Sequence, residues 1–115
     1  REEARHARLV GDLARRAGGC VPPVVVGPTA LPSLLALALE NVVEGVVREA
    51  YGAAQAFARA ARAEDRAVGE AMASIAAEEA QHAELSLRIH AFLWSKLGAG
   101  ERAEVDAARA AAIAG

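Results

Sequence analysis

The sequence predicts an all-α protein, folded as one antiparallel helix bundle, and three observations support this prediction. Apolar residues make up 54% of the 115 residues, but much of that share is alanine, which favours helix. Three segments repeat apolar residues at alternating spacings of three and four, the period of one helix face. All four prolines fall between residues 22 and 32, so they leave the rest of the chain free to be helical.

The first predicted helix covers residues 1–17, and a connector over residues 18–32 follows it. Gly18 and Gly19 end the helix, because one of the pair can take the left-handed conformation of a C-terminal cap. Prolines exclude helix from the connector, so we expect Val24 to Val26 to form an extended crossover against the bundle. The expected inner face of this first helix carries Glu3, His6, Val10, Leu13 and Ala17.

A second helix is predicted over residues 33–63, and Ser33 after a proline is a suitable N-cap for it. Two of its faces are apolar and both also carry acids, which predicts a largely buried helix. The turn at residues 64–65 is so short that the next helix, over residues 66–97, must be its antiparallel neighbour. A short alanine-rich helix over residues 101–114 ends the chain, and we assign it no chemistry.

A repeated octet carries the candidate chemistry. The segment from Glu2 to Leu9 recurs from Glu78 to Leu85, with six of eight residues identical at an offset of 76. Each copy holds a glutamate and a histidine three residues apart, a spacing that puts both side chains on one helix face. The inner-face members are Glu3 with His6 and Glu79 with His82, whereas Glu78 and Glu84 are expected to point away from the core.

The helix over residues 33–63 brings a further carboxylate to the same level. Symmetry about the short turn places Glu49 opposite Glu79 and His82, and some stagger would place Glu44 there instead. Buried acids are costly unless they are paired, hydrogen-bonded or bound to a metal. Two imidazoles with three or four carboxylates suit two divalent cations, and the mixed oxygen and nitrogen donors favour iron or manganese. The alternative is a non-catalytic interaction module whose acids and histidines bond to one another.

With these residues, the chain resembles the ferritin-like superfamily. It looks most like bacterial ferritin-like domain proteins that read Glu-Gly-x-x-x-Glu and then Asp/Glu-Glu-x-x-His-Ala, here the segments from Glu44 to Glu49 and from Glu78 to Ala83. The resemblance covers most of residues 1–97. It implies a four-helix bundle of two helix pairs, and we expect this chain to lack the first helix, the glutamate helix of the first pair.

The resemblance also implies roles for the ligand residues. Glu3 and Glu79 would bridge or chelate the metals, while His6 and His82 would each hold one. Glu44, by alignment of the motif, or Glu49, by level, would supply the remaining carboxylate of this chain. The implied function is iron oxidation and storage, or oxidoreductase chemistry with dioxygen or peroxide, at a di-iron or di-manganese carboxylate site.

The charge pattern limits the partners. Thirteen basic and fifteen acidic residues are mixed along the chain without a basic patch, so we expect no binding to nucleic acid. The longest apolar-rich stretch, residues 31–47, is interrupted by Glu40, Asn41 and Glu44, so we expect no membrane span. A second copy of the chain, in a homodimer, would complete the bundle over the apolar groove that the absent helix leaves.

Overall fold

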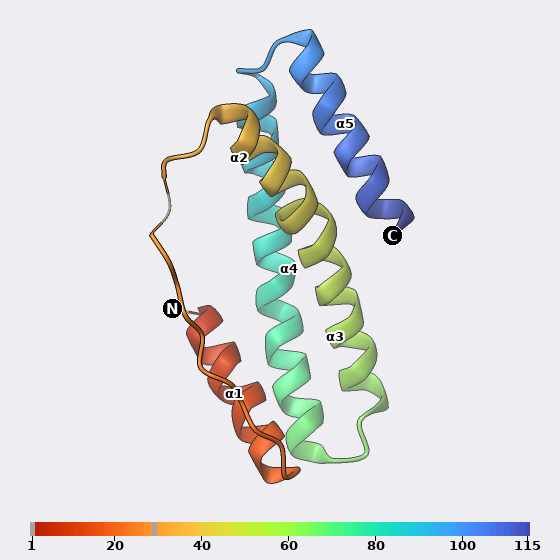
Figure 1. Cartoon of the computed structure of the whole chain (residues 1–115). Coiled ribbons are helices and arrows are strands. Elements are labelled where there is room, and N and C mark those ends of the chain that lie inside the picture. The colour runs from red at the N-terminus through yellow and green to blue at the C-terminus, as the bar shows by residue number, and fades with distance from the viewer. Residues whose placement is uncertain (1, 29) are drawn as a thin grey trace.

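The computed structural model describes residues 2–28 and 30–115, and within them it contains helices but no strand (Figure 1). The all-α prediction is therefore confirmed for the described residues. Residue 1 of the first predicted helix lies outside them. The helical elements are α1 (Glu2–Arg16), α2 (Leu34–Glu40), the π-helical segment η1 (Asn41–Glu49), α3 (Ala50–Arg62), α4 (Arg66–Trp94) and α5 (Ala99–Ala114).

Gly18 and Gly19 cap the C-terminal end of helix α1. Gly18 takes a φ of +82°, a left-handed conformation that glycine adopts without strain. The backbone N–H of Gly19 donates to the carbonyl of Ala14 at 2.8 Å, which satisfies one of the last carbonyls of the helix.

The described residues of the connector after α1 have no regular secondary structure, and the connector returns along the bundle to the start of α2 (Figure 1). The expectation that Val24 to Val26 lie against the bundle is wrong, because these side chains are 86% to 91% exposed. Prolines exclude helix from the segment, and neither core cluster includes these valines.

The segments α2, η1 and α3 follow one another without a break and form one long helical rod (Figure 1). Ser33 caps its start, since the hydroxyl accepts the N–H of Ala36 at 3.1 Å. A short turn leads into α4, which Asp65 caps by accepting the N–H of Val68 at 3.1 Å. The rod and α4 are therefore antiparallel neighbours.

Two clusters of small and branched side chains form the core. The larger lies where α5 covers η1 and the end of α4, and the smaller lies between α3 and the first half of α4. Helix α1 packs on α4, on a different side from α5 (Figure 1). No helix in the described part of the chain is long and apolar enough to cross a membrane. The buried core residues are Ala38, Val42, Leu93, Leu97 and Val105 in the larger cluster and Ala56, Ile75 and Ala76 in the smaller.

Candidate metal centre

The two octets meet where the first turns of α1 cross the middle of α4. The helices run antiparallel, so the two copies face each other about an approximate two-fold axis. Ring centroids of His6 and His82 lie 6.4 Å apart across this axis. The structure thus brings together the four residues that the repeat predicts, Glu3, His6, Glu79 and His82.

Each inner carboxylate offers one oxygen to each imidazole. Glu79 Oε1 lies 3.0 Å from His6 Nδ1, and Glu79 Oε2 lies 3.6 Å from His82 Nδ1. Glu3 repeats the pattern in reverse, with Oε1 at 3.2 Å from His82 Nδ1 and Oε2 at 3.7 Å from His6 Nδ1. Both Nδ1 atoms therefore point at the same two carboxylates, one on each helix.

Two further carboxylates hold the outer edges of the rings. His6 Nε2 lies 2.7 Å from Glu78 Oε2, and His82 Nε2 lies 2.7 Å from Glu2 Oε2. A carboxylate accepts the N–H at Nε2, so it fixes the tautomer that leaves the Nδ1 lone pair free. Metal-ligating histidines are held in this way by their outer partners.

Sequence reasoning missed these two outer carboxylates. The expectation that Glu78 points away from the core is wrong, since this residue reaches across to the ring on the opposite helix. Inner-face periodicity within one helix cannot detect a contact made between helices. The available signal was the repeat itself, which preserves the first glutamate of each octet, Glu2 and Glu78, as well as the second.

The surroundings of His6 fit a bound cation. Its side chain is only 9% exposed, and its Nδ1 atom is buried with no hydrogen-bond partner although it faces two carboxylates. A lone pair buried against anionic oxygens is unfavourable unless the ring is protonated or a cation lies between them. Ligand atoms from Glu3, His6 and Glu79 all lie within 4.8 Å of one another, as a shared ion requires.

The charges around the cluster also fit a bound cation. The rings are surrounded by Glu2, Glu3, Glu78 and Glu79, and among the described residues Arg5 is the cation bonded to one of these carboxylates. With neutral imidazoles this set carries a negative excess, which divalent cations would offset. Oxygen and imidazole donors without thiolate are suited to iron or manganese.

Hydrogen bonding shifts the pKa of Glu78 and the pKa of His82. The guanidinium of Arg5 lowers the pKa of Glu78, and the hydrogen bond from His6 adds to this effect against the opposing influence of burial. The hydrogen bond to Glu2 raises the pKa of His82, with further support from the charges of Glu79, Glu3 and Glu49. Glu78 is therefore held ionised, while the His82 ring binds a proton more readily than a free histidine.

Of the two candidate carboxylates on the rod, Glu49 lies nearer to the cluster. Its Oε2 accepts a hydrogen bond from Ser86 Oγ at 3.0 Å, and Ser86 lies one helical turn beyond His82. Glu44 is exposed and forms an ion pair with Arg48. Both line an open groove of about 470 Å³ between the rod and α4, and the structure places neither within the four-residue cluster.

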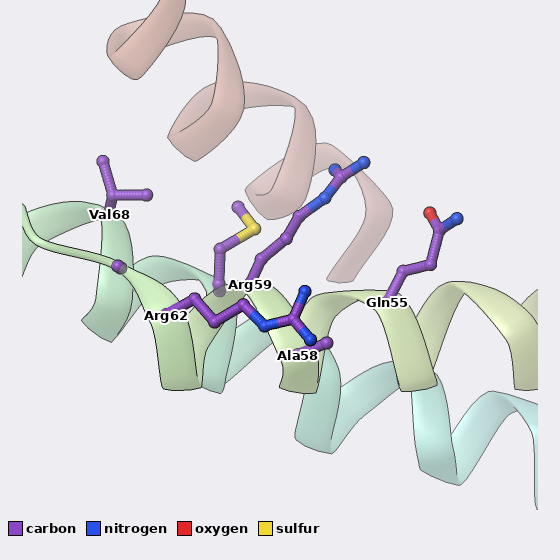
Figure 2. A pocket seen from close by; sticks show the side chains of 7 residues that line it. Gln55, Ala58, Arg59, Arg62 and Val68 are labelled. Carbon is purple, nitrogen blue, oxygen red and sulfur yellow. The ribbon is translucent and has the colours of Figure 1, made fainter.

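A separate pocket of about 590 Å³ lies near the end of α3 and contains none of the predicted ligands (Figure 2). Arg59 and Arg62 stand in the last turn of α3, where cationic side chains interact favourably with the helix dipole. Figure 2 shows the two guanidinium groups pointing in different directions, so they do not converge on one ligand position. We therefore assign this pocket no chemistry.

Comparisons of the chain with protein families, with curated proteins and with solved structures find no match. The chemistry of the site is therefore inferred from its own geometry.

Proposed function

We propose that the chain is a ferritin-like protein that binds two divalent cations, iron or manganese, between α1 and α4. The observation that carries this proposal is that two imidazole Nδ1 atoms face the same two carboxylates, each at 3.0 to 3.7 Å. In this proposal the carboxylates of Glu3 and Glu79 would hold the cations, and His6 and His82 would each bind one.

The remaining side chains of the site fix the protonation and the orientation of the two histidine rings. Glu78 and Glu2 keep the protons at Nε2 of His6 and His82, so that both Nδ1 atoms stay available as ligands. Glu49 is the further carboxylate that we expect to turn toward the His82 position, in preference to the surface-paired Glu44. Bound iron or manganese would supply redox chemistry with dioxygen or peroxide, and in a storage role iron itself is the substrate.

Metal content after anaerobic loading with ferrous ion tests this function. We expect about two ions per chain, as in the ferritin-like pattern, and their loss in the double variant Glu79→Gln/His82→Gln. The matched control is Glu84→Gln/His90→Gln, which changes the same residue types on the same helix outside the cluster. No metal above background in the unaltered chain would instead leave the alternative, a non-catalytic interaction module.

We also propose that a second copy covers the cluster. Ser74, Glu78 and His82 form the row of α4 that contacts α1. The same row continues through Leu85, Ile89 and Phe92, which are exposed on the described part of the chain.

The mass of the protein in solution tests this assembly. We expect a homodimer in sedimentation equilibrium, and Phe92→Ser is expected to shift it toward monomer because it places a hydroxyl in the shared apolar surface. A protein that is strictly monomeric at high concentration, with or without metal, would exclude the homodimer.

A further inference from the structure

The two octets differ at only two positions, and one of these differences lies beside the candidate metal centre. Arg5 in the first copy corresponds to Gln81 in the second, and Arg8 corresponds to Glu84. A perfectly repeated pair would give two equivalent cation positions. The Arg5 to Gln81 difference breaks that equivalence at the outer edge of one imidazole.

On the first side, a chain of contacts fixes the His6 ring. Arg5 Nη1 donates to Ser74 Oγ at 3.1 Å, and Arg5 Nη2 is bonded to Glu78 Oε1. The other oxygen of Glu78 accepts from His6 Nε2 at 2.7 Å. The guanidinium therefore holds both the position and the ionised state of the carboxylate that orients the ring.

The second side has the same hydrogen bond, but to a more exposed carboxylate. Glu2 Oε2 lies 2.7 Å from His82 Nε2, and the Glu2 side chain is 56% exposed, against 24% for Glu78. Gln81, which corresponds to Arg5, makes no side-chain hydrogen bond within the residues that the structure describes. The orientation of His82 thus depends on a more exposed partner than the orientation of His6.

We infer that Arg5 is a positioning residue that makes the two cation positions unequal, by holding Glu78 and His6 in the geometry that binds a cation. This inference rests on the proposed function. The His6 position is pre-organised, and the His82 position must order Glu2 when a cation binds. Loss of an outer partner of a metal-ligating histidine typically costs about 10- to 100-fold in metal affinity.

A positive charge near a cation site could act in the opposite direction, through repulsion. Two features make positioning the stronger effect here. The guanidinium charge is offset by the carboxylate that it contacts, and that carboxylate bonds the edge of the ring opposite Nδ1. The two effects predict opposite results when the arginine is removed, so one experiment separates them.

Calorimetric titration with Mn²⁺ tests the inference on the full chain, because this ion binds without a redox reaction. We expect two unequal binding steps in the unaltered protein. Arg5→Gln should weaken one step by about tenfold or more and leave the other within about twofold. Arg5→Lys, which keeps the charge but loses the planar fork, should rescue only part of the affinity.

Two further variants complete the test. Arg8→Gln removes the same charge from the same helix outside the contact chain, and we expect it to leave both steps unchanged. Gln81→Arg places a guanidinium beside Glu2 and should tighten the weaker step, so the inference stays testable if Arg5→Gln fails to fold. Unchanged or tighter binding in Arg5→Gln would overturn the positioning role, whereas no Mn²⁺ binding by the unaltered chain would overturn the proposed function itself.

Discussion

His6 is the residue on which the proposed cation binding rests most directly. Its Nε2 edge is satisfied by Glu78, while its buried Nδ1 has no hydrogen-bond partner. Native proteins rarely leave a buried polar atom in this state without a compensating group. Under the proposed function, a cation would satisfy this atom, and in the metal-free protein a proton would take its place.

The same balance predicts opposite pH dependences for the metal-free and metal-bound protein. The pKa of His82 is raised in the fold, chiefly by its hydrogen bond to Glu2. Protonated His82 therefore contributes fully to the stability of the metal-free protein below its pKa in the unfolded chain, about 6.5. This contribution is lost as the pH rises through the higher pKa of His82 in the folded protein. Metal affinity should instead rise over this range, because a cation requires the neutral ring.

Denaturant unfolding of metal-free protein and Mn²⁺ titration, each between about pH 6 and pH 8, measure these two trends. His82→Gln is the control for the unfolding experiment, since it removes the titrating group and should remove the corresponding part of the pH dependence of metal-free stability. Metal-free stability that rises with pH relative to this variant would contradict the assigned direction of the pKa shift.

The π-helical segment η1 approaches α4 closely at Gly45. A Cβ atom built on Gly45 would lie 2.5 Å from Ser86 Oγ and 2.8 Å from Ser86 Cβ, so glycine is required for this approach. Asn41 Nδ2 donates to the carbonyl of Ser86 at 3.0 Å, and the Ser86 hydroxyl donates to Glu49. The segment thus sets the level at which Glu49 meets α4.

Two glycines of the long rod provide a matched pair of substitutions. Gly45→Ala should destabilise the fold by about 1–2 kcal/mol, because overpacking outweighs the gain of about 1 kcal/mol in helix propensity. Gly52→Ala should stabilise it by about 0.5–1 kcal/mol, since a Cβ there meets nothing within 4 Å. Urea unfolding monitored by circular dichroism measures both, and equal effects of the two substitutions would show that Ser86 is not tightly packed.

The helices could be predicted from sequence because they depend on the spacing of apolar residues and on capping residues at the helix ends. Ser33 and Asp65 each cap the helix expected after them, and Gly18 ends the first. The π-helical geometry of η1 could not be predicted, because it depends on packing against α4 and not on local preference. The exposure of Val24 to Val26 was missed for a related reason, since burial depends on the path that the chain takes through space.

The same distinction applies to the candidate site. Repetition within the sequence is a local observation, and it sufficed to predict that Glu3, His6, Glu79 and His82 come together. The contacts of Glu78 and Glu2 run between helices, so they required the structure.

At the scale of the whole molecule, the cluster joins a weakly held helix to a better-packed remainder. Neither core cluster includes a residue of α1, and the main neighbour of α1 is α4. The side-chain hydrogen bonds and ion pairs between these two helices lie at the candidate site, and Arg16 lies near Asp65 at the other end. Bound cations would therefore stabilise α1 more than any other helix.

Hydrogen exchange measured with and without Mn²⁺ should show this difference. We expect amide exchange in α1 to slow by about tenfold or more at saturating metal, because a ligand that binds only the closed form stabilises it by mass action. Exchange in α5, which packs on the larger core far from the cluster, should be unchanged and serves as the internal control. Equal slowing in both helices would indicate that α1 opens only when the whole chain unfolds.

The exposed connector between α1 and α2 acts as a tether, because its valines contribute little to packing. A covalent link between two associating parts fixes a local concentration, on the order of millimolar, at which one octet meets the other. If the chain were cut at Val24 to Val26, the two pieces would associate to the same extent as in the intact chain only when mixed near that concentration. Under the proposed function, a cation bound between the octets would lower the concentration that the pieces need, so reassembly of the halves would report the ion.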